Sequence, residues 1–443
     1  MRRTTKKVAP EDSRKRPWNG RLLQNAMALM VSSGGTAVLG LVFWTTATHL
    51  SKAATVGRMS AEIAAMILLA NLAQLSFGSI FERFLPVAAR QTRAFVLRAY
   101  VMCISFAFIA SIAYVFSGLA HSFIPSSFGW RALFVVAVVL WTIFMLQDNV
   151  LVGLRASRWV PVENILFSAA KLALIPAFIM VTQSQGIFLA WTAPVGFAII
   201  AVNWYLFKTR IPDHMASSTL SEKLPATREL ILLAGAQYAT LIFNVFAPSI
   251  VTLIVIERLG PVANAHYYVP QLITTSLALF NWSIVRSFLV EAASDPQAMR
   301  RHANVTIGAL TVVLVPSVVI GVILAPEILQ VFGASYAADG TTLLRMLLLS
   351  LPCMAVTIFY SSFAWLDKHV WWMALRELAS LIIFLGVMFV LIGHYGILSI
   401  GIASLVSSGI QAIFFLPISI RRYRMTSNTD APQGGASNVA SKA

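Results

Sequence analysis

The chain alternates between long apolar blocks and short polar segments, and this pattern predicts its elements. Inside the blocks, apolar residues follow one another without the strict alternation of a half-buried strand. Windows of about 19 residues predict about twelve spans, each long enough to cross the hydrocarbon core of a bilayer as a helix. The predicted spans are Leu23–Leu50, Ala61–Leu85, Tyr100–Leu119, Ala132–Leu154, Val162–Val181, Ile187–Phe207, Leu230–Ile256, Ala265–Leu289, Val305–Leu324, Leu343–Trp365, Trp371–Ile392 and Ile397–Ile418.

Composition supports a membrane location for these spans. Of the 443 residues, 58% are hydrophobic and only 11% are charged, whereas about a quarter of the residues of a soluble globule carry charge. Inside lipid the backbone must satisfy its own hydrogen bonds, so only helices or a closed barrel can span, and the short alternating segments of a barrel are absent from the sequence. We therefore predict an all-α polytopic membrane protein.

Lysine and arginine predict the orientation of the spans. Basic residues from Arg2 to Arg21 precede the first span, and others from Arg421 onward follow the last. Between them, alternate loops carry basic clusters at 90–98, 155–158 and 208–228, while the opposite loops carry few. Positive charge favours the cytoplasmic side, so both termini are expected in the cytoplasm of a multi-pass protein. The net charge of +16 thus marks membrane topology, and we expect no nucleic-acid partner.

The longest polar stretch between spans divides the chain into two sets of about six helices. This gives a predicted order of two six-helix segments, with a basic cytoplasmic tail before them, a cytoplasmic linker between them, and a disordered cytoplasmic tail rich in Ser, Asn, Ala and Gly after them. The corresponding ranges are 1–21 for the first tail, 22–206 for the N-terminal lobe, 207–229 for the linker, 230–420 for the C-terminal lobe and 421–443 for the last tail.

The two halves contain similar stretches, which indicates an internal repeat. When Arg83 in "FERFLPVAAR" is aligned with Arg286 in "IVRSFLVEAA", Phe77 falls on Phe280 and Val87 on Val290. The tripeptide "TIF" occurs at 142–144 and again at 357–359, before a glutamate in each half. Paired halves with a site between them are a recurrent plan of membrane transporters.

Several longer stretches resemble the polysaccharide exporters, the Wzx-type flippases, of the multidrug/oligosaccharidyl-lipid/polysaccharide (MOP) superfamily. The resemblance covers most of the chain and depends on the order and spacing of these stretches. They are "FGSIFERFLPVAAR" (Phe77–Arg90), "DNVLVGLRASRWVPVENILFSAAKLALI" (Asp148–Ile175), "ERLGPVANAHYYVPQLI" (Glu257–Ile273), "VFGASYAADGTTLLRMLLLS" (Val331–Ser350) and "HYGILSIGIASLVS" (His394–Ser407).

The resemblance implies a function. It implies a two-lobed bundle in the bacterial cytoplasmic membrane, whose cavity opens alternately to each side. It also implies a cargo of polyprenyl-diphosphate-linked oligosaccharide or polysaccharide repeat units, flipped to the outer leaflet for the synthesis of cell-surface polysaccharides such as O-antigen, with membrane lipids and other polysaccharide assembly proteins as partners. The related lipid II flippases usually have fourteen spans and a charged first helix, whereas 31–48 carries no charge here.

Basic residues inside the spans are the first candidates for the cargo site, because arginine binds phosphate oxygens bidentately and intramembrane charge usually faces the bundle interior. Arg83 and Arg286 are predicted to hold the diphosphate; the alternative is that both extend to the headgroups as topology anchors. Lys171 lies near mid-bilayer and either contributes positive charge to the cavity or forms a structural ion pair with a neighbouring helix.

Acidic and amide residues form a second set of candidates. Glu62, Asp148, Glu163 and Glu377 either balance the cavity cations or bind a coupling cation or proton. Because Glu163, Arg376 and Glu377 begin their spans, an interfacial position is favoured for them. Gln74 and Asn281 either contact sugar hydroxyls or form hydrogen bonds between helices.

Three classes of function compete. The leading one is a lipid-linked oligosaccharide flippase, and the alternative from the same superfamily is a drug or cation antiporter, which would favour an acidic cavity. A membrane glycan polymerase is disfavoured because the outer loops are short, so we expect no enzyme. The sequence contains no phosphate-binding Walker loop and no metal-ligand spacing, and we expect no cofactor and no metal.

Overall fold

The protein is described by a computed structural model that places residues 20–217, 227–294, 299–366 and 370–425. Side chains are described for 34–216, for 249–285 apart from 280 and 283, for 300–362, for 372 and for 375–423. Throughout the described residues the chain is helical, with no strand, which confirms the predicted all-α class.

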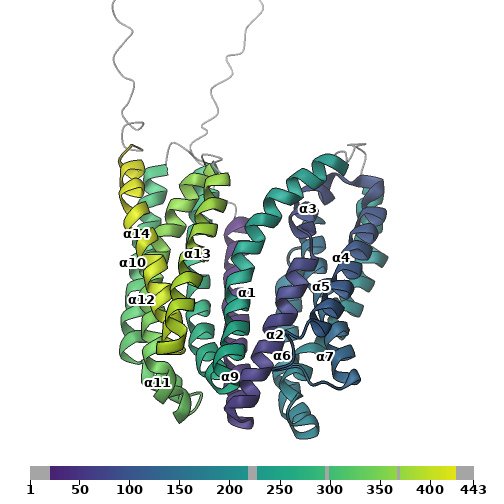
Figure 1. Ribbon diagram of the computed structural model, residues 1–443. Helices are drawn as coiled ribbons and strands as arrows, with labels where there is room; N and C mark the ends of the chain where they lie inside the picture. The colour runs from purple at the N-terminus through teal and green to yellow at the C-terminus, as the bar shows by residue number, and fades with distance from the viewer. Residues whose placement is uncertain (1–19, 218–226, 295–298, 367–369, 426–443) are drawn as a thin grey trace, which may run out of the picture.

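The first half of the chain forms one bundle (Figure 1). Its elements are α1 (Gly20–Leu50), α2 (Ala53–Ala73), α3 (Phe77–Phe84), the 3-10 turns η1 (Leu85–Val87) and η2 (Ala89–Gln91), α4 (Thr92–Phe116), α5 (Phe128–Gly153), α6 (Trp159–Thr182), α7 (Gly186–Tyr205), the π-turn η3 (Leu206–Arg210) and α8 (Ile211–Ser217).

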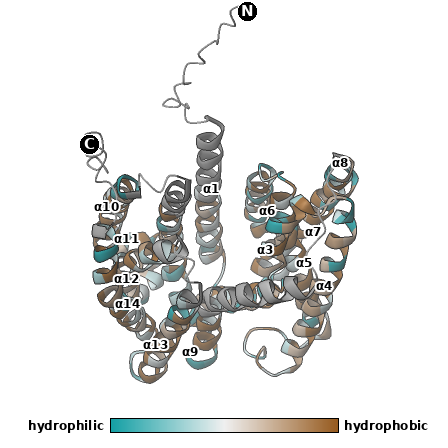
Figure 2. Cartoon of the chain, turned by 90° about the horizontal axis from the view of Figure 1, so that it is seen from above, coloured by the Kyte–Doolittle hydropathy of each residue, from teal (hydrophilic) through white to brown (hydrophobic). Residues whose placement is uncertain are grey.

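The second half forms the other bundle, and Figure 2 shows α10, α12, α13 and α14 on the opposite side of the molecule from α3 to α7. Its first element bends at Gly260, where φ is 87° and ψ is 175°, so it consists of two helical arms. The elements are α9 (Thr227–Ser294), α10 (Met299–Ile323), α11 (Ala325–Gln330), α12 (Ala334–Leu366), α13 (Val370–Tyr395) and α14 (Leu398–Met425).

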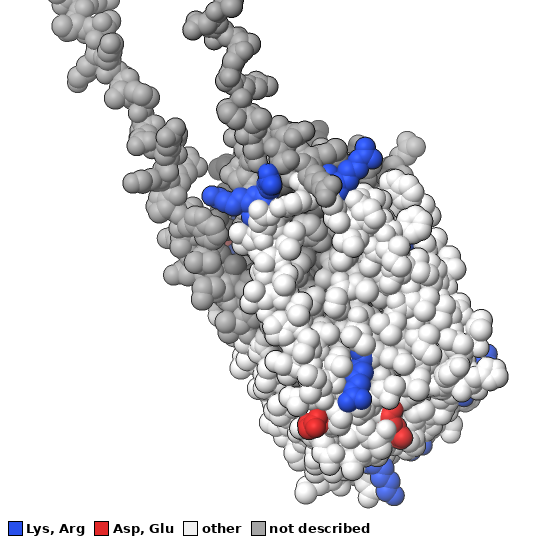
Figure 3. Space-filling view, turned by 90° about the vertical axis from the view of Figure 1, so that its left-hand side faces the viewer, with Lys and Arg blue, Asp and Glu red and all other residues white. Residues whose placement is uncertain are grey.

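Within the described residues, nine helices are long and apolar enough to cross a membrane. The predicted total of about twelve also includes α1 and the two arms of α9, whose side chains are only partly described. Many large apolar side chains lie exposed on the outside, among them Ile109, Met180 and Phe197, as lipid contact requires. On the face shown in Figure 3, the charged side chains lie toward the two ends, with an uncharged band between them.

Two predicted boundaries differ from the structure. The span predicted at 61–85 is interrupted, because Leu75 and Ser76 have positive φ values of 49° and 62° and end α2 before α3 begins. Arg83 therefore lies on a short separate helix rather than in the last turns of a long one. The predicted linker at 207–229 begins as helix, since η3 and α8 continue the direction of α7 as far as Ser217.

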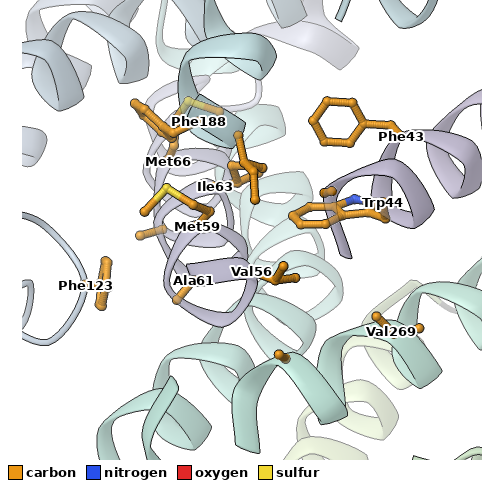
Figure 4. Close-up of a cluster of buried hydrophobic side chains, with 14 of the residues drawn as sticks. Phe43, Trp44, Val56, Met59, Ala61, Ile63, Met66, Phe123, Phe188 and Val269 are labelled. Carbon is orange, nitrogen blue, oxygen red and sulfur yellow. The ribbon is translucent and has the colours of Figure 1, made fainter. Parts of the chain in front are cut away.

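The two bundles meet along α2 and α9, which make the most extensive contact between any two elements. Close approach is possible because Gly57 has no side chain: a Cβ there would lie 1.8 Å from the carbonyl oxygen of Pro261. Figure 4 shows the buried cluster beside this seam, where Trp44 of α1 lies near Val56 of α2 and Val269 of α9. The core of the protein is thus continuous across both bundles.

Candidate functional site

Lys171 lies in the middle of α6 and is surrounded by aromatic rings. Its side chain is buried, with 4% relative exposure. The ammonium nitrogen lies 3.7 Å from the ring centroid of Trp191 in α7, 5.0 Å from Phe167 in α6 and 5.3 Å from Phe43 in α1. We call these three residues the aromatic cage. In the described part of the chain, no carboxylate lies within 4 Å of Lys171, so its positive charge is stabilised by ring faces.

The aromatic cage lies next to the seam between the bundles. Trp44 of α1 lies 6.1 Å from Trp191 and 4.6 Å from Tyr268, measured between ring centroids. Tyr268 belongs to the second arm of α9, so this chain of rings connects Lys171 in the first bundle with a residue of the second. A movement of one bundle relative to the other would change the surroundings of this lysine.

Polar residues of α5, α6 and α7 form a second, partly buried group, the carboxyl cluster: Gln147, Asp148, Glu163, Asn164 and Asn203. Asn203 Nδ2 donates to Gln147 Oε1 over 2.7 Å, Gln147 Nε2 donates to Glu163 Oε1, and Asn164 Nδ2 donates to Asp148 Oδ2 over 3.2 Å. These reciprocal bonds bring the carboxyl groups of Asp148 and Glu163 into one polar network between α5 and α6.

The carboxyl cluster keeps several buried polar atoms without a hydrogen bond. Among the described residues, Asp148 Oδ1, Glu163 Oε2 and the hydroxyl of Tyr100 in α4 have no partner. Such atoms cost free energy unless water or an ion satisfies them. The described side chains contain no group of three or more His, Cys, Asp or Glu that could hold a metal ion.

A third polar group lies in the second bundle, where α9, α12, α13 and α14 enclose a cavity of about 260 Å³. We call it the serine–arginine pocket, after Arg376, Glu377, Ser380, Ser407 and Gln411, which line it. Arg376 pairs with Glu377 and donates to Gln411 Oε1 over 3.1 Å. Gln411 in turn donates to Ser380 Oγ over 2.7 Å, so the network joins α13 to α14.

The other predicted site residues are distributed as follows. Arg83 is exposed, and its guanidinium carbon lies 5.3 Å from the ring centroid of Phe84. Arg286 lies in α9, but its side chain is outside the described residues. Gln74 is buried and its Nε2 lies 3.4 Å from both Asn71 Oδ1 and Met145 Sδ, so it faces the interior of its own bundle. Neither Arg83 nor Gln74 joins the aromatic cage.

Two further candidates are buried with unpartnered atoms. Asn281 of α9 has no described partner for its Nδ2. Glu62 lies near the middle of α2, and its Oε2 has no partner within the described part of the chain. The structure thus brings Asp148 together with Glu163, and Glu377 together with Arg376, while Glu62 is separate from both groups.

Glu163 and Arg376 lie near the beginning of their helices, as the sequence indicated, and neighbouring helices cover their side chains. Sequence reasoning missed the serine–arginine pocket as a site. Its signal was the spacing of Ser404, Ser407 and Gln411, which places them on one face of a helix that is otherwise apolar.

The two polar groups occupy matching helices of the internal repeat. The repeated threonines, Thr142 of α5 and Thr357 of α12, are both buried and both donate to the carbonyl four residues earlier. The carboxyl cluster uses α6 and α7 after the first threonine, and the pocket uses α13 and α14 after the second. Each bundle thus contains one polar group, with a pair of carboxyl groups in the first and an arginine in the second.

No family model matches the chain, and no curated protein matches it either. Several solved structures do match the chain, and they show the same fold. An inward-facing conformation of a multidrug resistance MATE family transporter of the MOP superfamily is 15% identical, with a TM-score of 0.64 over 92% of this chain and 100% of that chain. An outward-facing conformation of such a transporter gives 14% identity and a TM-score of 0.60 over 92% of this chain and 96% of that chain.

A third structure carries information about pocket polarity. It is a MOP superfamily transporter from Pyrococcus furiosus, described as having a binding pocket of reverse polarity that suggests a different function. It is 13% identical to this chain, with a TM-score of 0.56 over 92% of this chain and 96% of that chain. The chain is therefore a multi-pass membrane protein with the two-lobed fold of MATE transporters of the MOP superfamily.

Proposed function

We propose that this protein is a transporter that flips polyprenyl-diphosphate-linked glycans from the inner to the outer leaflet of the bacterial cytoplasmic membrane. Both termini lie in the cytoplasm in this proposal. The observation that carries it is the position of Lys171, a buried ammonium beside the seam between the bundles with no described carboxylate within 4 Å. A positive charge that lacks a protein counter-ion favours an anionic ligand.

The chemistry of the cargo explains why such a charge is useful. Sugar and diphosphate must cross a medium that solvates neither, while the polyprenyl chain can remain in lipid. A buried cation costs free energy in the absence of an anion, and a diphosphate that enters its neighbourhood removes that cost. Lys171 thus lowers the barrier at the depth where the headgroup is least well solvated.

The aromatic cage makes this binding reversible. A desolvated cation–π contact stabilises an ammonium by about 2 kcal/mol, and a hydrogen bond to a charged group contributes about 1.5–3 kcal/mol. The ring of Trp191 at 3.7 Å and a phosphate oxygen therefore compete for Lys171 on nearly equal terms. A transporter needs this balance, since a cargo held too tightly would not be released.

Arg83 and Arg286 extend the proposal toward the cytoplasm. Both belong to the stretches that the internal repeat aligns, and in the proposal they capture the diphosphate before it reaches Lys171. The Pyrococcus furiosus neighbour is described as having a pocket of reverse polarity, so pocket charge differs among proteins of this fold. A basic site is therefore compatible with the MATE architecture.

One observation favours a second candidate, a proton-coupled drug or cation antiporter. The carboxyl cluster provides a buried acidic pair, and neighbours of the same fold are described as multidrug resistance transporters. In the flippase proposal the same pair serves as a proton-coupling site. The two functions differ in the charge of the cargo, which decides the test.

The test uses full-length protein in proteoliposomes that contain a polyprenyl-diphosphate-linked N-acetylglucosamine. An added galactosyltransferase modifies only sugars on the outer face. Without the protein, the enzyme should modify only the lipid-linked sugars of the outer leaflet. With the protein, we expect nearly all of the lipid-linked sugar to be modified. We also expect that the protein does not expel ethidium. Expulsion of ethidium without lipid translocation would establish the antiporter instead.

Variants of two lysines locate the site. Lys171→Met should abolish translocation, and Lys171→Arg should retain much of it, because the arginine keeps the charge. Lys208→Met is the matched control: Lys208 also lies over an aromatic ring, 4.8 Å from the centroid of Trp204, but it is exposed. Normal translocation by Lys171→Met would remove this residue from the cargo site.

A further inference from the structure

The serine–arginine pocket has a chemistry that the diphosphate site does not use. We propose that it binds one uncharged, hydroxyl-bearing sugar ring. This inference rests on the proposed function, because the ring would belong to the glycan of the same cargo. The pocket is separate from the aromatic cage, since it lies between helices of the second bundle, whereas the cage belongs to α1, α6 and α7.

The polar side chains of the pocket are held in fixed orientations by one another. Arg376 uses one terminal nitrogen for Gln411 and the other for Glu377. Ser407 Oγ donates to the backbone carbonyl of Ser380 over 3.0 Å, and the two serine hydroxyls lie 3.2 Å apart. A site with such internal support is rigid before a ligand arrives, which lowers the entropic cost of binding.

One strong donor in this network remains unused. The Nε of Arg376 is buried and has no hydrogen-bond partner among the described residues. The side chain of Arg376 has only 9% relative exposure, so bulk water does not solvate this group freely. A ligand oxygen placed beside Nε would accept a hydrogen bond from this buried N–H.

The charge of the pocket selects a neutral ligand. Glu377 already balances Arg376, so a phosphate would bring a second negative charge close to a carboxylate, and a cation would meet the guanidinium. A purely apolar ligand would leave Nε unpaired. Hydroxyl groups both donate and accept, and they match a wall in which amide, hydroxyl and guanidinium groups alternate.

Apolar side chains and the size of the cavity also suit a sugar ring. Trp282, Leu381 and Phe384 line the pocket as well, and their apolar faces suit the C–H face of a pyranose. The volume of about 260 Å³ is close to the lower end of the range of about 300–1,000 Å³ for pockets of drug-sized ligands, so there is room for one ring.

The experiment measures sugar binding directly, with full-length protein in lipid nanodiscs. The probes are the methyl glycosides of glucose and N-acetylglucosamine, detected by saturation-transfer NMR. We expect ring-proton signals from at least one glycoside, and Ser407→Ala and Gln411→Leu should each weaken its binding about tenfold, the effect of losing one hydrogen bond to a neutral ligand. Ser317→Ala changes a half-buried serine of α10 whose hydroxyl bonds its own helix; it is the matched control and should bind normally.

Several outcomes overturn the inference. Absence of ring signals from both glycosides would do so, as would equal binding by wild type and Ser407→Ala. Displacement of the sugar by inorganic pyrophosphate would show an anion site instead. Lys171→Met separates the two proposals: it should lose lipid translocation and keep the sugar signal. Failure of the wild-type protein to translocate lipid, with sugar binding intact, would reject the flippase and retain a sugar pocket, whereas normal translocation without sugar binding would reject the pocket alone.

Discussion

The side-chain amide of Asn264 in α9 donates to the backbone carbonyl of Gly57 in α2 over 2.7 Å. The same nitrogen lies 3.1 Å from Ser60 Oγ, and all three residues are buried. These bonds connect the two bundles at the end of the molecule where α1 turns into α2 and where α9 bends at Gly260. The structure is closed along this contact, which a transporter with two bundles must break to open on that side.

Gly57→Ala should destabilise the closed seam. The new Cβ would lie 1.8 Å from the carbonyl oxygen of Pro261, a distance that the backbone can relieve only by moving the bundles apart. Overpacking of this kind costs about 1–3 kcal/mol, so thermal unfolding in detergent should begin at a lower temperature. Gly196→Ala is the control, because no atom lies within 4 Å of its Cβ position, and it should unfold at the wild-type temperature or above. Equal melting of the two variants would show that the seam tolerates the methyl group.

A disulfide across the seam should stop translocation. Ser60 and Asn264 contact each other through their side chains, so Ser60→Cys with Asn264→Cys should form a bond under oxidising conditions once Cys103 and Cys353 are replaced. The oxidised protein should lose lipid translocation, and dithiothreitol should restore it. Each single cysteine variant serves as a control that should be insensitive to oxidant. Full activity of the cross-linked protein would mean that this contact stays closed throughout transport.

Arg83→Gln and Arg286→Gln should each impair translocation while the protein inserts at normal levels. Loss of one partner of a charge-assisted contact weakens binding by about 2–5 kcal/mol. Lysine at either position keeps the positive charge but cannot bind phosphate bidentately as the planar guanidinium does. The loss of translocation in the lysine variants should therefore be smaller than in the glutamine variants. Arg93→Gln, an exposed position at the start of α4, should be neutral. If Arg83→Gln and Arg286→Gln translocate lipid as well as Arg93→Gln does, the two arginines act as topology anchors.

Glu163→Gln should separate folding from proton coupling. The amide oxygen of the glutamine can still accept the hydrogen bond from Gln147, but the side chain can neither bind nor release a proton. We therefore expect a melting temperature no lower than that of the wild type, together with loss of the stimulation of translocation by a pH gradient. Glu327→Gln changes an exposed glutamate of α11 and should keep that stimulation. A gradient response that persists in Glu163→Gln would exclude this carboxyl group from coupling.

Much of the fold could be predicted from sequence because lipid leaves the backbone few choices. A long apolar block must be a helix, and the break between 207 and 230 marked the division into two bundles. The interruption of α2 was not predicted, since Leu75 and Ser76 adopt positive φ in a stretch without glycine or proline. Hydropathy averages over a window and does not detect a single turn of this kind.

The candidate site was predicted in part. Lys171, Asp148 and Glu163 were selected because charge is costly inside a membrane, and that cost holds wherever the side chain points. Their partners could not be predicted: Phe43, Trp191 and Asn203 come from other helices and carry no charge that distinguishes them in the sequence. Arg376 was assigned to the interface because its place along the chain was known but the helices covering it were not.

The sequence by itself determined that this chain is a helical membrane protein, because the length and apolar character of each segment decide whether it spans. Only the tertiary structure decided which polar residues form groups. A hydropathy average takes no account of which side of a helix a residue occupies, and packing against neighbouring helices then decides which side is buried. That packing placed Lys171 among aromatic rings, brought Asp148 and Glu163 into one hydrogen-bonded network, and placed Arg376 in a pocket of the second bundle.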